Sequence, residues 1–149
     1  MSLITQFREK DFNTGFNHYE GVFEKTGIYF DILLMDENNK TEICDAENET
    51  AIVIISGTGD IEYEDSNIFF NRDNWIEHDP TIVHLSPNES AIISATTATK
   101  AAIVKTPNSN AFKGRIYTPA DIDTEHRGKD QLDNTCYRLV RLAFDRTIA

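Results

Sequence analysis

The sequence predicts an all-β protein of one domain, folded as a sandwich or a barrel with short irregular termini. Seven or eight short apolar runs follow one another at close spacing, and turn-forming residues separate them. None of these runs shows the periodicity of a convincing amphipathic helix. The chain has 149 residues, of which 40% are hydrophobic, and this is enough for one sizeable core.

The first half of the chain predicts an irregular or edge-strand entry followed by short strands. The first twenty-five residues carry scattered aromatic side chains without a helical stripe, namely Phe7, Phe12, Phe16, Tyr19 and Phe23. Apolar runs then predict strands at residues 28–34, 41–44 and 51–55. Residues 36–40 are typical of a turn, because Asp and Asn tolerate positive φ. We interpret Ser56-Gly-Thr-Gly59 as a tight reversal into the alternating run 60–64, which predicts a hairpin.

The second half continues with strands and ends in a different pattern. Further strands are predicted at residues 67–70, 81–86, 91–95 and 101–104. A turn at 87–89 joins two of them. The run Thr118–Asp121 predicts a short helical turn, because a Thr in the N-cap position precedes a Pro at the first helical position. Residues 123–130 are expected to form a charged loop and 137–144 a last strand, with a short helix as the alternative.

The charge balance excludes two classes of partner. The chain has 25 acidic and 14 basic side chains, and its formal net charge is −11. It lacks the clustered Lys and Arg that nucleic acid or an anionic membrane surface requires, so we expect neither partner. A few local cations can still bind an anionic substrate. No apolar stretch approaches the ~20 residues that cross a bilayer.

Two features of the sequence indicate a cytoplasmic location. The amino terminus carries charged residues where a secretory signal needs an apolar run. Cys44 and Cys136 lie far apart and form no CxxC pair. We therefore expect two reduced thiols, with a single disulfide as the alternative.

The histidines support only a limited metal hypothesis. His78 and His84 are six residues apart, which places them on one face of an unbroken strand, but Pro80 is expected to interrupt that strand. A metal site needs three or four convergent ligands, and no HxH or HxxxH spacing provides a nucleus for one. Surface or rim histidines are the plainer interpretation.

Two other patterns do not indicate a catalytic site. Gly57-Thr-Gly59 lacks the context of a phosphate loop, and the hydroxyl-rich run 94–99 lacks a nucleophile motif.

Three segments resemble known protein families. Ala51–Ile61 (AIVIISGTGDI) resembles the start of a cupin barrel. Two further segments are similar to motifs of the 5-deoxy-glucuronate isomerases of inositol catabolism, a family related to 5-keto-4-deoxyuronate isomerase. These segments are Arg72–Pro87 (RDNWIEHDPTIVHLSP) and Arg127–Val140 (RGKDQLDNTCYRLV). They occur in the family's order and at a similar separation, and the resemblance spans roughly residues 17–146.

The resemblance implies a fold, a domain organisation and a cofactor. The implied fold is a cupin-type β-barrel, also called a double-stranded β-helix or jelly roll, and residues 1–149 would form a single cupin-like domain. Members of the family look like two barrels in tandem, so this chain is expected to be the amino-terminal half of a protein that continues past Ala149. Zinc is expected in the family's second barrel, held there by His and Glu side chains.

The cupin metal motif is incomplete in this chain. Gly57 matches the closing glycine of the motif, and Glu49 lies one residue out of frame with its carboxylate. Residues 42–45, where two histidines should stand, contain none. The histidine of the second motif is replaced by Ala91 and Ile92. Because cupin metal sites depend on neutral imidazoles, we expect no metal and no cofactor in this barrel.

The functional expectation that follows is a metal-free barrel of a sugar isomerase. The intact protein would interconvert an aldose and a ketose in its second barrel, and this chain alone would be inactive, without catalytic residues of its own. Arg127, Lys129 and Arg138 are the candidates for contact with the carboxylate of a sugar acid, since Arg offers a bidentate fork. Surface salt bridges in an acidic protein are the plainer interpretation of these three residues.

Two other functions remain open. The first is a metal-free cupin that binds a small sugar acid or mediates dimerisation, which a ligand-dependent rise in melting temperature would indicate. The second is a stand-alone enzyme with a metal held by His78, His84 and nearby carboxylates. In each case we expect a homo-oligomer, because barrel edges near the termini expose unpaired strand groups.

Overall fold

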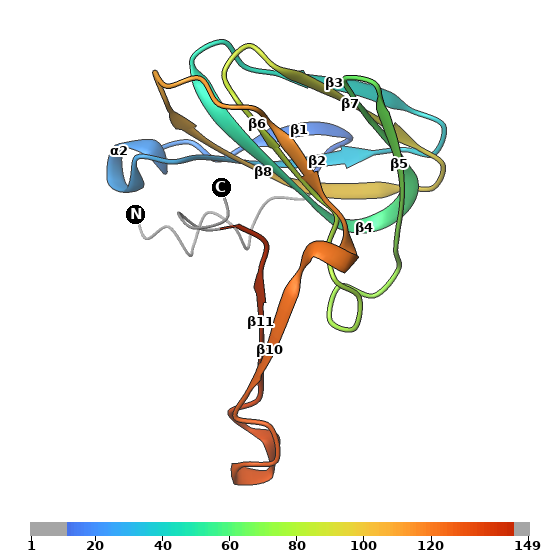
Figure 1. Ribbon diagram of the computed structural model, residues 1–149, viewed down its shortest axis with the longest axis vertical. Coiled ribbons are helices and arrows are strands. Elements are labelled where there is room, and N and C mark those ends of the chain that lie inside the picture. The colour runs from blue at the N-terminus through green and yellow to red at the C-terminus, as the bar shows by residue number, and fades with distance from the viewer. Residues whose placement is uncertain (1–11, 145–149) are drawn as a thin grey trace.

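The structure, a computed structural model, describes residues 12–144, and its regular secondary structure consists almost entirely of strands (Figure 1). The all-β prediction is therefore confirmed. In chain order the strands are β1 (Gly15–His18), β2 (Tyr29–Met35), β3 (Lys40–Cys44), β4 (Asn48–Tyr63), β5 (Ser66–Arg72), β6 (Ile82–Leu85), β7 (Ser90–Ala95), β8 (Thr99–Pro107), β9 (Arg115–Tyr117), β10 (Asp123–Arg127) and β11 (Arg138–Leu142). Three single-turn helices accompany them: α2 (Phe23–Thr26), η1 (Pro119–Asp121) and η2 (Leu132–Asn134).

Nine of the strands form a barrel in which β4 belongs to two sheet layers. One layer has the order β1-β2-β8-β4-β6-β9, and the other joins β3, β7, β4 and β5. All of these pairs are antiparallel. The first half of β4 pairs with β6 and β8, whereas its second half pairs with β5 and β7. This long strand therefore connects the two layers.

The centre of the barrel is filled by apolar side chains from both layers. The large side chains with less than 2% exposure include Leu33, Ile52, Ile54, Ile61, Phe70, Leu85, Ile93 and Ile103. They alternate with exposed or half-buried residues along each strand, as expected for strands that cover a core with one face. The barrel is thus a packed core over most of its length.

The predicted reversal at Ser56–Gly59 is wrong, because β4 runs through these residues without turning. Instead, Gly57 allows a bend in the strand, and Gly59 allows close contact with a neighbouring strand. The register with β8 shifts between Ile54 and Ser56, and Gly57 has a φ of 122°. A Cβ on Gly59 would lie 2.2 Å from the carbonyl oxygen of Ser94. Glycine at these positions lets β4 pass from one layer to the other.

The other local predictions are mostly confirmed. The turns at 36–40 and 87–89 form with positive φ at Asn38 and Asn88. A capping box between Thr118 and Asp121 closes the predicted helical turn. The entry contains the edge strand β1, although α2 was not predicted. Phe7 lies outside the described residues.

Two further features concern the cysteines and the helices. Cys44 and Cys136 are both free and exposed. None of the helices within residues 12–144 has the length and apolar character needed to cross a membrane. The short helices connect strands and contribute no buried residue of their own.

The charged loop predicted at 123–130 is wrong in its first half, which forms strand β10. This strand pairs with β11 as a separate two-stranded hairpin, with Glu125 opposite Val140. The hairpin, residues 123–142, is called the arm below. In Figure 1 the arm points away from the barrel, with η2 at its tip. A run of charged residues hid this strand, because both faces of an exposed hairpin can be polar.

Candidate functional site

One end of the barrel interior is polar, and this end forms the candidate site. On β2, Asp31 shares the inward face with Leu33. On β8, Lys105 follows Ile103 on the inward face and stands opposite Thr50 of β4. Because side chains of a strand alternate between its faces, these polar groups continue the inward rows of the core. The interior therefore changes from apolar to polar at the end of the barrel where the chain connects β3 to β4.

A pocket of about 390 Å³ opens at this polar end, which we call the barrel mouth. One part of its lining is aromatic and comes from the segment between β1 and β2 and from the first two residues of β2: Tyr19, Phe23, Tyr29 and Phe30. The rings of Phe23 and Tyr29 stack with centroids 4.2 Å apart. Another part of the lining is polar and contains His18, Asp31, Asp45, Asn48 and Lys105. Aromatic faces beside hydrogen-bonding groups suit a small polar ligand with an apolar face.

Two contacts, each between a basic side chain and a carboxylate, organise the polar wall of the barrel mouth. Nδ1 of His18 lies 2.7 Å from Oδ1 of Asp31, and the Asp31 side chain is only 8% exposed. Nζ of Lys105 donates to Oδ2 of Asp45 at 3.1 Å. Both partners of this second pair are about four-fifths buried. These contacts bring two carboxylates and two basic groups to the pocket, whose lining also includes the carboxylates of Glu20 and Glu24.

The Asp45 carboxylate is held in its charged form. Burial raises its pKa, but hydrogen bonds from the backbone N–H of Glu47 and from the side chain of Asn48, together with the Lys105 ammonium, outweigh burial. The pKa of Asp45 therefore lies below its ordinary value. Burial also raises the pKa of Tyr19, so the phenol keeps its proton at neutral pH. The mouth can offer both fixed acceptors and donors.

Two side-chain oxygens near the barrel mouth are buried without a hydrogen-bond partner among the described residues. They are Oδ1 of Asn48 and Oγ1 of Thr50. A buried polar atom without a hydrogen bond lowers the stability of the fold by about 1–3 kcal/mol. Such atoms are therefore rare in a core that has no function besides stability. Both residues precede the apolar part of β4. Their position marks this end of the barrel as suited to a polar group.

The donor set of the barrel does not fit a transition metal. The position in β3 that faces inward is Ile43, which pairs with Ala91 of β7, and both side chains are buried in the core. Glu42 and Cys44 are exposed on the other face. Glu49 accepts a hydrogen bond from Asn108 at 2.6 Å. Among the described residues no three His, Cys, Asp or Glu side chains form a group that could hold a metal ion.

The structure does not bring His78 and His84 into one site. His78 lies in the loop after β5, with its Nδ1 2.8 Å from Oδ1 of Asp73. His84, on β6, is half-buried, and its ring packs against two phenylalanines. The centroid of the His84 ring lies 4.6 Å from that of Phe112 and 4.5 Å from that of Phe144. Burial lowers the pKa of His84, so the ring is neutral near pH 7. His84 acts as a packing residue.

The three predicted substrate contacts gather on the arm and not at the barrel mouth. Arg127 stands opposite Arg138 in the ladder, and Lys129 lies in the connection between the strands. All three are exposed, and Nη2 of Arg127 pairs with Oε2 of Glu125 at 2.6 Å. A contact of these residues with a sugar acid stays a prediction.

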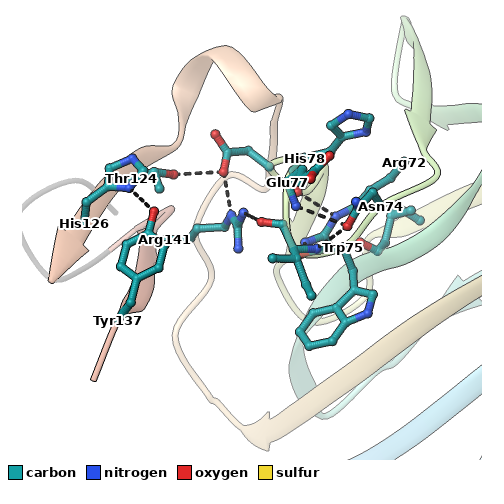
Figure 2. Close-up of polar contacts among 12 residues, drawn as sticks. Arg72, Asn74, Trp75, Glu77, His78, Thr124, His126, Tyr137 and Arg141 are labelled. Atoms are coloured by element: carbon teal, nitrogen blue, oxygen red, sulfur yellow. Dashed lines mark hydrogen bonds and ion pairs between the residues drawn. The ribbon is translucent and has the colours of Figure 1, made fainter. Parts of the chain in front are cut away.

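Sequence reasoning missed a buried arginine that holds the loop beneath the arm (Figure 2). Arg72 is only 6% exposed and donates to three backbone carbonyls, those of Ile54, Trp75 and His78. It begins one of the two segments that resemble the isomerases. That resemblance was the one sequence feature that pointed to Arg72, because the neighbouring residues in the sequence do not predict that this arginine is buried.

The residues of the barrel mouth were also missed. His18, Asp31, Asp45 and Lys105 come from four separate parts of the chain. The one available signal was an acidic residue, Asp31, inside an apolar strand. A buried carboxylate in such a place needs a partner, and the sequence does not show which residue provides it.

Comparisons with solved structures identify the fold. An IolB-like protein from Salmonella typhimurium LT2 matches with a TM-score of 0.75 at 19% identity, over 93% of this chain and 53% of that chain. Ectoine synthase from P. lautus matches with a TM-score of 0.52 at 16% identity, over 69% and 74% of the two chains. The cupin domain of Cnp3 from Schizosaccharomyces pombe matches with a TM-score of 0.50 at 10% identity, over 66% of each chain. The fold is a cupin-type β-barrel, as predicted.

The sequence comparisons identify the family. No curated protein matches the chain. The model of the KduI/IolB family matches residues 4–148, which include both segments that resemble the sugar isomerases. The chain spans about half the length of the IolB-like protein from Salmonella. On this evidence the chain belongs to the KduI/IolB family.

Proposed function

We propose that this chain is the metal-free, amino-terminal cupin barrel of a 5-deoxy-glucuronate isomerase-like protein of inositol catabolism. The intramolecular aldose–ketose isomerisation takes place in a second barrel, which binds the zinc. Membership of the KduI/IolB family supports this assignment, and so does the match to about half of the IolB-like protein. The protein acts on a small sugar acid in the cytoplasm.

One observation carries the proposal. Where a cupin metal site needs inward-facing imidazoles, this barrel has Ile43 and Ala91 packed in its core. Buried apolar side chains cannot polarise a carbonyl or move a proton between adjacent carbons. The fold is therefore retained without the imidazoles that hold the metal in a cupin site.

An activity assay tests the catalytic part of the proposal. The purified chain is incubated with 5-deoxy-glucuronate, with and without added zinc, and bound metal is measured by mass spectrometry. We expect no turnover and no stoichiometric metal. Turnover that a chelator abolishes would contradict the proposal and favour the stand-alone enzyme. The double variant H78A/H84A would then show whether those histidines hold the metal.

A genetic observation tests the two-barrel part. We expect the reading frame to continue past the codon for Ala149 into a second barrel with a His-x-His pair and a following Glu. A stop codon at that position would remove the catalytic half and favour the second candidate function.

The second candidate is a binding module for a small sugar acid, and the barrel mouth favours it. Lys105 can pair with a carboxylate, His18 can form a hydrogen bond through its other ring nitrogen, Asp31 and Asn48 can accept from hydroxyls, and the aromatic wall can cover the apolar face of the sugar. A thermal-shift titration with glucuronate, and with glucose as the neutral comparison, tests this function.

For this candidate we expect glucuronate to raise the melting temperature and K105M to abolish the rise. K113M removes an exposed lysine that is absent from the lining of the mouth, and it serves as the matched control. Equal shifts in the two variants would exclude the barrel mouth as the site.

A further inference from the structure

The arm presents a sheet with two open edges. Within the described residues β10 and β11 pair only with each other, so the outer edge of each strand has no ladder partner. A two-stranded hairpin alone is marginally stable in water, and unpaired strand edges readily recruit another strand. The arm therefore has backbone groups ready for a partner.

The base of the arm is fixed to the barrel, which sets the direction in which the arm projects (Figure 2). Oδ1 of Asp79 accepts hydrogen bonds from Thr124 of β10 and Arg141 of β11. Arg141 also donates to the carbonyl of Ile76. After β11 the chain returns to the barrel, where Phe144 packs with Tyr117. Only the outer part of the arm is left without such support.

The exposed face of the arm carries apolar side chains that the barrel does not cover. Arg138, Val140 and Leu142 share this face of β11, and Val140 and Leu142 are both more than one-third exposed. Leu132, at the tip of the arm, is 74% exposed, and Tyr137, whose ring stacks on that of His126, is 38% exposed. Exposed apolar residues in a cluster indicate an interaction surface.

The charge balance of the arm is compatible with a second copy of this chain as the partner. The arm has four acidic and four basic side chains, so it is neutral, whereas the whole chain carries −11. Two copies that met through their acidic barrels would repel each other. The arm is a surface through which two copies can approach without adding like charges.

The residue pattern selects β11 as the seam. In a two-fold symmetric antiparallel pair centred on Val140, Val140 would face its own copy and Arg138 would face Leu142 of the second chain. The same arrangement for β10, centred on Glu125, would oppose two glutamates, which is unfavourable. We propose that the arm is a dimerisation element in which β11 pairs with β11 of a second copy around Val140.

The first test is the oligomeric state of the full chain. Sedimentation equilibrium over a micromolar concentration series is expected to give twice the mass of one chain. V140K places a lysine opposite Glu125 in its own hairpin, which preserves the arm, but opposes two lysines across the seam. We expect V140K to be monomeric with an unchanged circular dichroism spectrum. A monomeric parent chain, or a V140K dimer as stable as the parent, would overturn the proposal.

The second test locates the seam by cross-linking. In the background C44S/C136S, V140C should form an intermolecular disulfide on mild oxidation, because the two sulfurs are adjacent across the symmetry axis. E125C is the matched control, since the two copies of this residue would lie three strand spacings apart, about 14 Å. Cross-linking of E125C but not V140C would overturn the choice of β11. No cross-link in either variant would show that the arms do not meet.

Discussion

The barrel and the arm are both antiparallel ladders of this chain, and they differ in what covers their faces. In the barrel, β4 is paired on both sides, and its inward side chains Ile52 and Ile54 are fully buried. In the arm, five residue pairs form the ladder and no residue of β10 or β11 is buried. The stability of a ladder therefore depends on the apolar area it removes from water and much less on its backbone hydrogen bonds.

The two regions are joined by a small number of contacts. The first is the cluster of Asp79 with Thr124 and Arg141, at the base of the arm. Burial raises the pKa of Asp79, but the hydrogen bonds from Arg141 and Thr124 and the nearby positive charges outweigh burial and lower it. Just beyond the arm, Phe144 stacks on His84 of the barrel and holds the end of β11 near it. Changes at these contacts should separate the behaviour of the arm from that of the barrel.

The largest expected effect comes from a cavity in the barrel. F70A removes a side chain that is 2% exposed, and we expect it to lower the free energy of unfolding by about 3–5 kcal/mol. L132A, at the exposed tip of the arm, is the matched control and should change stability by less than about 0.5 kcal/mol. Urea denaturation followed by circular dichroism measures both. Comparable losses would mean that the arm is part of the cooperative core.

A smaller effect is expected at the base of the arm. R141M removes the charged hydrogen bonds to Asp79 but keeps a long apolar stem, and we expect a local loss of about 1–3 kcal/mol. R127M breaks an exposed ion pair with Glu125 and should cost at most about 1 kcal/mol.

Hydrogen exchange measured by mass spectrometry distinguishes the two arginine variants. R141M should accelerate exchange in residues 123–142 and leave β4 and β8 unchanged. Equal acceleration in R127M would show that Arg141 does not anchor the arm. Faster exchange throughout the barrel would show that the two regions unfold together.

The smallest expected effect is a pH dependence at His84, where Phe144 packs on the barrel just after the arm. In the folded chain, burial lowers the pKa of His84. In the unfolded chain the imidazole of His84 takes up a proton near its ordinary pKa of 6.5. The unfolded state therefore binds more protons just below pH 6.5, and stability falls as the pH drops from there through the folded pKa.

H84F tests this assignment because it keeps a ring against Phe112 and Phe144 but removes the titration. Denaturation midpoints between pH 7 and 5, a window set by the titration range of histidine, should decline less steeply in H84F than in the parent chain. Parallel curves would indicate that His84 titrates alike in the folded and unfolded states.

Several parts of the structure could be read from local sequence. The strand runs were identified because period-two patterns and apolar runs report burial directly. The turns at Asn38 and Asn88 and the cap at Thr118 were identified because the side chain itself determines the local backbone. Family membership was predicted from the segments that contain Arg72 and Arg127 and is confirmed.

Other parts depended on contacts that are distant in sequence. Gly57 and Gly59 suggested a reversal, but the positions of Thr99 and Ser94 beside them show that glycine is needed for close packing. The strand β10 was hidden because a ladder exposed on both faces leaves no alternating pattern. The barrel mouth was hidden because Asp31, Asp45 and Lys105 meet only after β2, β8 and the turn before β4 have come together.

The sequence by itself therefore determined the fold class, the positions of most strands and the absence of imidazoles at the expected metal positions, since each depends on residue type and spacing. Tertiary structure decided that β4 crosses between layers, that the cations Arg127 and Arg138 lie on a projecting arm, and that one end of the barrel is polar. The physical reason is that the burial of a side chain and the identity of its hydrogen-bonding or ionic partner depend on how the elements pack. The pattern of residues along the sequence shows burial only where a single element has one buried face.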